Sequence, residues 1–114
     1  MKRTEIRRTT ALRPRRPGRR RANVHRDARW LSAVRDIECC VRCQQFGVEA
    51  AHRDVGKGMG QKTDDATTAA LCSACHHELG NGADLDRETR RHEMDWAIVE
   101  TIIELARAGR LAVR

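Results

Sequence analysis

Apolar residues recur at helical spacing near the end of the chain and predict its longest element there. Between Leu85 and Ala108 one apolar stripe has spacings of three and four, and a second stripe runs beside it. The first comprises Met94, Ala97, Ile98, Thr101, Ile102 and Leu105, and the second comprises Trp96, Val99, Ile103 and Ala106. The signs of the terminal charges suit the helix dipole, and Gly109 is a natural stop. We expect a helix that covers the core or pairs with a second copy.

Shorter elements are expected upstream. Asp27 is placed to cap a short helix, whose apolar positions are Trp30, Leu31, Val34 and Ile37. Residues 44–51 predict a hairpin with Phe46 and Gly47 near its turn and His52 at the end of the outgoing strand. Three glycines in residues 56–60 predict a loop. Residues 67–71 form a short apolar segment that suits a strand, and a helix is expected to begin at or just after Cys75.

The charge is divided unevenly along the 114 residues. Residues 1–29 carry a net +10 and residues 30–114 a net −3, which gives +7 overall. We expect residues 1–26 to be a disordered arginine-rich arm and residues 27–114 to be one folded domain. Such arms commonly bind phosphate backbones, although a neutral tail and an organelle-import peptide remain alternatives. No apolar run approaches a membrane span, and none follows the basic start, so we expect a cytoplasmic protein without membrane contact.

Four of the five cysteines form two matched pairs, Cys40 with Cys43 and Cys72 with Cys75. Two CxxC pairs are typical of a structural Zn²⁺ site, because each short turn directs two thiolates toward one point. Aromatic residues make up only 3% of the chain, so a thin aliphatic core would need such support. Cys39 competes with Cys40 as the first ligand, but the CxxC spacing favours Cys40. A disulfide-bonded secreted domain is the alternative use of these cysteines.

Histidines stand on both sides of the loop. His52 precedes it, and His76 directly follows the last cysteine of the second pair. A histidine on a strand, a loop and a histidine on a helix form the ββα-metal layout, whose chemistry is phosphodiester hydrolysis. One imidazole accepts a proton from water, and a divalent ion stabilises the charge on phosphate. Taken singly, His52 could be an ordinary polar residue, His76 a zinc ligand and Asp65 a cap or turn residue.

The segment from Glu49 to Lys62, with Asp65 and the Leu71–His76 run, resembles the HNH nucleases carried by phages and prophages. It is especially similar to small recombination-associated phage nucleases. The resemblance covers about residues 27–108 and implies a small zinc-stabilised α+β domain of the ββα-metal (HNH-like) type. Its flanking elements would be an N-terminal helix and a long C-terminal helix.

The same resemblance implies roles for individual residues. His52 would be the general base, Asp65 the residue that orients it, and His76 a ligand of a catalytic Mg²⁺ or Mn²⁺. Ala51 stands where many relatives have a second ligand, so the set is incomplete; His77, Asn81, Asp84 or Glu49 could complete it, or His52 could itself bind metal. Basic residues are expected to hold the phosphates: Arg15, Arg16, Arg19, Arg20, Arg21, Arg53, Lys57 and Lys62.

The sequence thus predicts a metal-dependent DNA endonuclease that acts in phage recombination or DNA processing. Its partners would be DNA and a phage or host recombination protein, with no organic cofactor. The competing hypothesis is a non-catalytic zinc module of phage origin that binds nucleic acid or protein. The missing ligand at Ala51 motivates this alternative.

Overall fold

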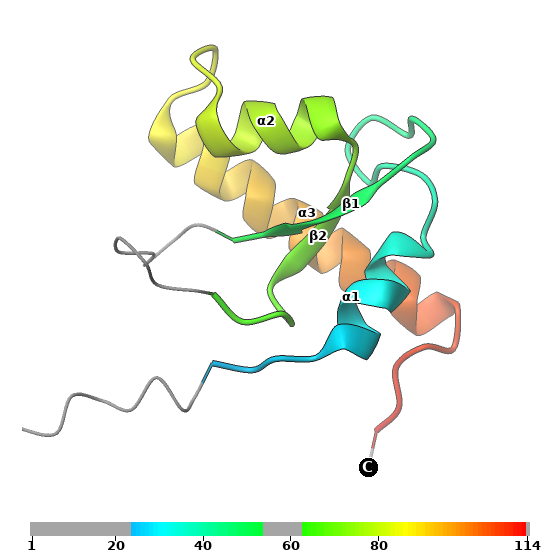
Figure 1. Ribbon diagram of the computed structural model, residues 1–114. Coiled ribbons are helices and arrows are strands. Elements are labelled where there is room, and N and C mark those ends of the chain that lie inside the picture. The colour runs from blue at the N-terminus through cyan, green and yellow to red at the C-terminus, as the bar shows by residue number, and fades with distance from the viewer. Residues whose placement is uncertain (1–23, 54–62, 114) are drawn as a thin grey trace, which may run out of the picture.

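The computed structural model describes residues 24–53 and 63–113 (Figure 1). In this part of the chain, three helices and one two-stranded sheet form a small α+β fold. Their order is α1 (Ala28–Arg35), β1 (Glu49–His52), β2 (Thr68–Leu71), α2 (Ser73–Asn81) and α3 (Arg87–Arg107). The α+β class is therefore as predicted, and β1, β2 and α2 follow one another as a ββα unit.

Strand β2 lies at the centre of the fold, and all four of its residues are buried. It pairs antiparallel with β1, with Glu49 opposite Leu71 and His52 opposite Thr68. On its other edge, Ala70 accepts a hydrogen bond from the Val41 amide (3.0 Å) and donates one to the Thr101 hydroxyl of α3 (3.0 Å). Helices α1 and α2 lie on opposite sides of the sheet, and α3 runs behind it in contact with β2 (Figure 1).

Helix α1 begins where the sequence predicts. The Asp27 carboxylate accepts hydrogen bonds from the amides of Arg29 and Trp30, which satisfies two of the free donors of the first turn. Val34 is fully buried, and the Trp30 indole donates to the Thr68 hydroxyl at 3.2 Å. The helix is thereby fixed to β2 across 38 positions of sequence.

Helix α3 confirms the longest predicted element, although it begins at Arg87, two residues after Leu85. Five of the six residues of the first predicted stripe are buried: Met94, Ala97, Ile98, Thr101 and Leu105. Ile102 was wrongly placed among them, because it turns away from the core and is 37% exposed. The helix ends at Arg107, just before the predicted stop at Gly109, whose φ of 68° suits glycine and lets the Arg110 amide bond to the Leu105 carbonyl (2.9 Å).

Two local predictions were wrong. The predicted hairpin turn at Phe46 and Gly47 does not form. Phe46 instead pairs with Cys39 in an isolated bridge, and the chain reverses between these two residues. The strand that follows, β1, pairs with β2. Helix α2 begins at Ser73 rather than at Cys75, because the Cys72 sulfur caps its first turn.

The folded part of the chain reaches further toward the N-terminus than residue 27. The His25 amide donates to the Asp64 carboxylate (2.7 Å), and the His25 carbonyl accepts from the Asp65 amide (2.9 Å). The candidate phosphate-binding residues Arg15, Arg16, Arg19, Arg20, Arg21, Lys57 and Lys62 lie outside the described residues. Within residues 24–53 and 63–113, no helix has both the length and the apolar character needed to cross a membrane.

Candidate metal centre and histidine sites

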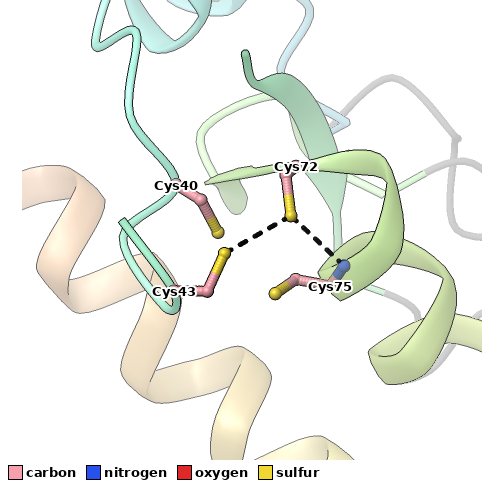
Figure 2. A group of neighbouring side chains, drawn as sticks. All are labelled: Cys40, Cys43, Cys72 and Cys75. Atoms are coloured by element: carbon pink, nitrogen blue, oxygen red, sulfur yellow. Dashed lines mark hydrogen bonds between the residues drawn. The ribbon is translucent and has the colours of Figure 1, made fainter. Parts of the chain in front are cut away.

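The four cysteines of the two CxxC pairs come together in the fold. Their sulfur atoms all lie within 4.8 Å of one another, and those of Cys43 and Cys72 are 3.6 Å apart (Figure 2). None of the five cysteines forms a disulfide, whose sulfurs would lie about 2.05 Å apart. Cys39 is outside the cluster, as the spacing predicts. The cluster is therefore close enough to hold a metal ion such as zinc.

Backbone geometry fixes the cysteine positions. In the first pair, the Gln44 amide donates to the Cys40 carbonyl (2.8 Å) and the Cys40 amide to the Gln45 carbonyl (2.8 Å), with Gln44 at a φ of 65°. In the second pair, Cys72 caps α2 and Cys75 lies in its first turn, where the Cys75 amide points to the Cys72 sulfur at 3.5 Å. Each turn therefore directs two sulfurs to the same point.

The chemistry of the donor set fits zinc. With zinc–sulfur bonds of about 2.3 Å, tetrahedral geometry places sulfurs about 3.8 Å apart, which is within the spread of this cluster. Burial raises the pKa of the Cys75 thiol to about 12, so a thiolate at this position needs a nearby cation. A divalent metal ion supplies that charge and displaces the proton.

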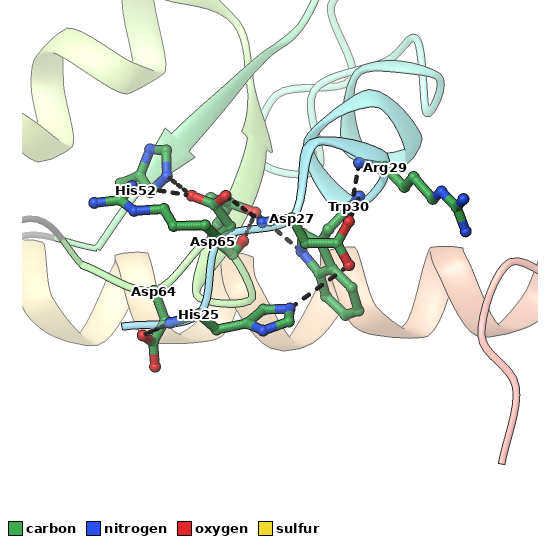
Figure 3. Close-up of polar contacts among 9 residues, drawn as sticks. His25, Asp27, Arg29, Trp30, His52, Asp64 and Asp65 are labelled. Atoms are coloured by element: carbon green, nitrogen blue, oxygen red, sulfur yellow. Dashed lines mark hydrogen bonds and ion pairs between the residues drawn. The ribbon is translucent and has the colours of Figure 1, made fainter. Parts of the chain in front are cut away.

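At the end of β1, His52 is bound to a buried carboxylate. Its Nε2 lies 2.9 Å from Oδ1 of Asp65, whose side chain is only 5% exposed (Figure 3). This is the contact that the resemblance implied for these residues. An ionised Asp65 can only accept, so in the neutral imidazole Nε2 carries the proton and Nδ1 the lone pair. The imidazole is one third exposed, which leaves it accessible to water.

Asp65 also has structural contacts that the sequence did not reveal. Its Oδ2 accepts from the Asp27 amide at 2.7 Å, and its Oδ1 lies 3.4 Å from the Arg26 guanidinium. Burial raises the pKa of Asp65, but the hydrogen bonds from His52 and Asp27 and the nearby positive charges outweigh this effect and lower it overall. Asp65 therefore anchors the start of α1 as well as contacting His52.

On α2, His76 contacts Glu49 and is not part of the cysteine cluster. Its Nδ1 lies 2.5 Å from Oε1 of Glu49 at the start of β1, and both side chains are substantially exposed. Of the residues considered as partners for His76, Glu49 is thus the one that contacts it. Because Glu49 and Ala51 alternate with His52 along the strand, the Glu49–His76 pair lies on the α2 face and His52 on the opposite face.

The remaining candidates are dispersed. His77 and Asp84 are exposed, and among the described residues the cysteines are the only group of three or more potential ligands close enough to share an ion.

Arg53, expected to hold phosphate, instead faces Asp95 of α3. Its Nη2 donates to Oδ2 at 3.2 Å, and its Nε lies 2.9 Å from Oδ1 without the alignment of a hydrogen bond. Its charge is therefore already compensated.

Comparisons with protein-family models, with curated proteins and with solved structures each found no match for this chain.

Proposed function

We propose that this protein is a metal-dependent DNA endonuclease of the HNH type, with a structural zinc held by the four clustered cysteines. The His52–Asp65 pair is the observation that carries the proposal. It presents an accessible imidazole, held by a buried carboxylate, at the end of the first strand of a ββα unit. Because Nε2 is bound to Asp65, Nδ1 is the nitrogen left to act as a proton acceptor.

In the proposed reaction, Nδ1 of His52 removes a proton from water, and the water oxygen attacks the phosphorus of a DNA phosphodiester. One P–O bond forms as the bond to the leaving sugar oxygen breaks, and that oxygen takes up a proton from solvent to leave as a hydroxyl group. Asp65 holds the imidazole in the required tautomer and stabilises the positive charge that it gains. Glu49 and His76 offer an oxygen and a nitrogen ligand for Mg²⁺ or Mn²⁺, which would stabilise the negative charge on the phosphate when bound.

A second candidate function is a non-catalytic zinc module that binds nucleic acid. The location of Glu49–His76 and His52 on opposite faces of β1 favours this candidate, because a single metal-activated phosphate must be reached by both groups. Asp65 would then serve only to anchor α1. The excess of arginine before residue 30 supports contact with phosphates under either proposal.

Nicking of supercoiled plasmid in Mg²⁺ or Mn²⁺ separates the two candidates. We expect the wild type to nick DNA, and we expect His52→Ala to lower the rate by about 10²–10⁴-fold, the usual contribution of a general base. His92→Ala is the matched control, because His92 is 79% exposed on α3. The nuclease proposal fails if the mutant keeps full activity, or if no metal supports cleavage. DNA binding without cleavage, unchanged by His52→Ala or His76→Ala, would support the zinc module.

A further inference from the structure

Arg42 lies inside the first CxxC pair and reaches across to the second. Its Nη1 is 3.6 Å from the Cys75 sulfur and 2.7 Å from Oε2 of Glu78 on α2. Its Nε is 3.6 Å from Oε2 of Glu93 on α3. The side chain is only 21% exposed. One guanidinium thus contacts the cysteine cluster and two helices.

The charge of a loaded cluster explains why a cation at this point matters. Four thiolates and one divalent ion carry a net charge of −2, and three of the four cysteines are buried. Burying such a charge is costly unless donors and cations surround it. Among the described residues, Arg42 is the only side chain with a positive charge that donates to a cluster sulfur. Hydrogen bonds that involve charged groups are about twice as strong as neutral ones.

The two glutamates orient this cation. Each Nη nitrogen of arginine carries two hydrogens, so Nη1 can donate to Glu78 and Cys75 together. Arginine stays charged at every accessible pH, and the 2.7 Å hydrogen bond to Glu78 holds the guanidinium in place. A lysine would retain the charge but not the planar arrangement of donors.

We propose that Arg42 is a positioning residue of the metal centre, which stabilises the Cys75 thiolate by a charged hydrogen bond and thereby strengthens metal retention. This inference depends on the metal centre and not on catalysis. A protein that binds metal tightly but does not cut DNA would contradict the proposed nuclease alone.

Two measurements on the full chain test this role. The first is Zn²⁺ affinity by competition with a chromophoric chelator, and the second is the visible spectrum of the Co²⁺-substituted protein. Arg42→Gln should lower Zn²⁺ affinity by about 10–100-fold, as loss of a residue that supports a ligand commonly does. It should also move the sulfur-to-Co²⁺ charge-transfer band to lower energy, because a sulfur without its cation gives up an electron more easily. The d–d bands, which report tetrahedral geometry, should stay in place.

The Zn²⁺ affinity and the charge-transfer energy of Arg42→Lys should lie between those of the wild type and Arg42→Gln. Arg42→Lys also preserves the test if Arg42→Gln does not fold. Arg35→Gln is the control, because Arg35 is exposed on α1, and it should match the wild type. The proposal is overturned if Arg42→Gln and Arg35→Gln give the same affinity and the same charge-transfer band. Altered d–d bands would also overturn it, since they would assign Arg42 to loop geometry. A wild type that binds neither ion would remove the metal centre and this proposal together.

Discussion

The Asp65 carboxylate is bound by both the Asp27 amide and His52, and both contacts favour its negative charge. Oδ2 accepts from the Asp27 amide at the start of α1, and Oδ1 accepts from His52. Burial raises the pKa of Asp65, yet these donors lower it overall. A group whose folded pKa lies below its unfolded value, about 3.9 for Asp, stabilises the fold above that unfolded value. This stabilisation is lost as the pH falls through the folded pKa.

Asp65→Asn should therefore destabilise the protein by about 1–3 kcal/mol at pH 7, because an amide cannot accept from every donor around it. The difference in unfolding free energy between wild type and mutant should narrow as the pH falls below about 4. Urea unfolding across pH, followed by circular dichroism, measures this difference. Asp64→Asn, at the more exposed neighbour, is the control. A difference that stays constant with pH would show that the charge of Asp65 does not stabilise the fold.

At the scale of single residues, spacing identified the cysteines but not the residues that support them. A CxxC turn is a local structure, so the pattern of four sulfurs is readable from the sequence. Arg42 approaches Cys75 from 33 positions away, and Glu49 approaches His76 from 27. Such contacts depend on how β1, α2 and the first CxxC pair fold together, which no local pattern reports.

At the scale of elements, helices were predicted better than the sheet. Asp27 and Gly109 are local signals, and the helical period of α3 selected the side that faces β2. The partner of β1 could not be chosen in this way. Strand pairing is non-local, and the sequence predicted a local hairpin over residues 44–51 in place of pairing with the true partner, β2. The chain instead reverses between Cys39 and Phe46, in the segment that contains the first CxxC pair.

Thr101 joins α3 to the open edge of β2, and its substitution tests that contact. The hydroxyl is fully buried, accepts from the Ala70 amide and donates to the Ala97 carbonyl at 2.7 Å. Thr101→Val preserves the volume but leaves the amide unpaired, which should cost about 1–3 kcal/mol. Thr101→Ser keeps the hydroxyl and loses a methyl group, which should cost about 0.5–1.5 kcal/mol. In urea unfolding, Thr101→Val should be less stable than Thr101→Ser. The opposite order would show that packing of the methyl group matters more than the hydrogen bond to Ala70.

At the scale of the whole molecule, the core is too thin to explain stability by packing alone. The largest fully buried apolar side chains are those of Leu71, Leu105 and Val34. Phe46 is 77% exposed and Trp96 47% exposed, so Trp30 is the one aromatic residue of the three that packs against the core. The cysteine cluster joins the residue 40–43 turn to the start of α2. A bound metal would therefore contribute folding energy directly.

Removal of metal should accordingly unfold the domain. We expect a strong chelator to reduce the far-ultraviolet helical signal, and we expect added Zn²⁺ to restore it. Cys72→Ser should lower metal content and melting temperature, whereas Cys39→Ser should change neither, because Cys39 lies outside the cluster. Metal content by mass spectrometry with parallel thermal melts tests both variants. If Cys72→Ser and Cys39→Ser lost metal and melting temperature equally, the assignment of Cys72 and not Cys39 as a metal ligand would be contradicted.

Chemical rescue tests the proposed role of His52 most directly. The measurement is the rate of plasmid nicking by the zinc-loaded His52→Ala protein in Mg²⁺ or Mn²⁺, as the concentration of added imidazole increases. If His52 is the general base, imidazole should occupy the space that the side chain leaves and restore nicking with a saturable dependence, while His92→Ala should not respond. The role of His52 as general base would be contradicted if His52→Ala nicks DNA at the wild-type rate without imidazole, or if imidazole never restores an activity that the wild type possesses.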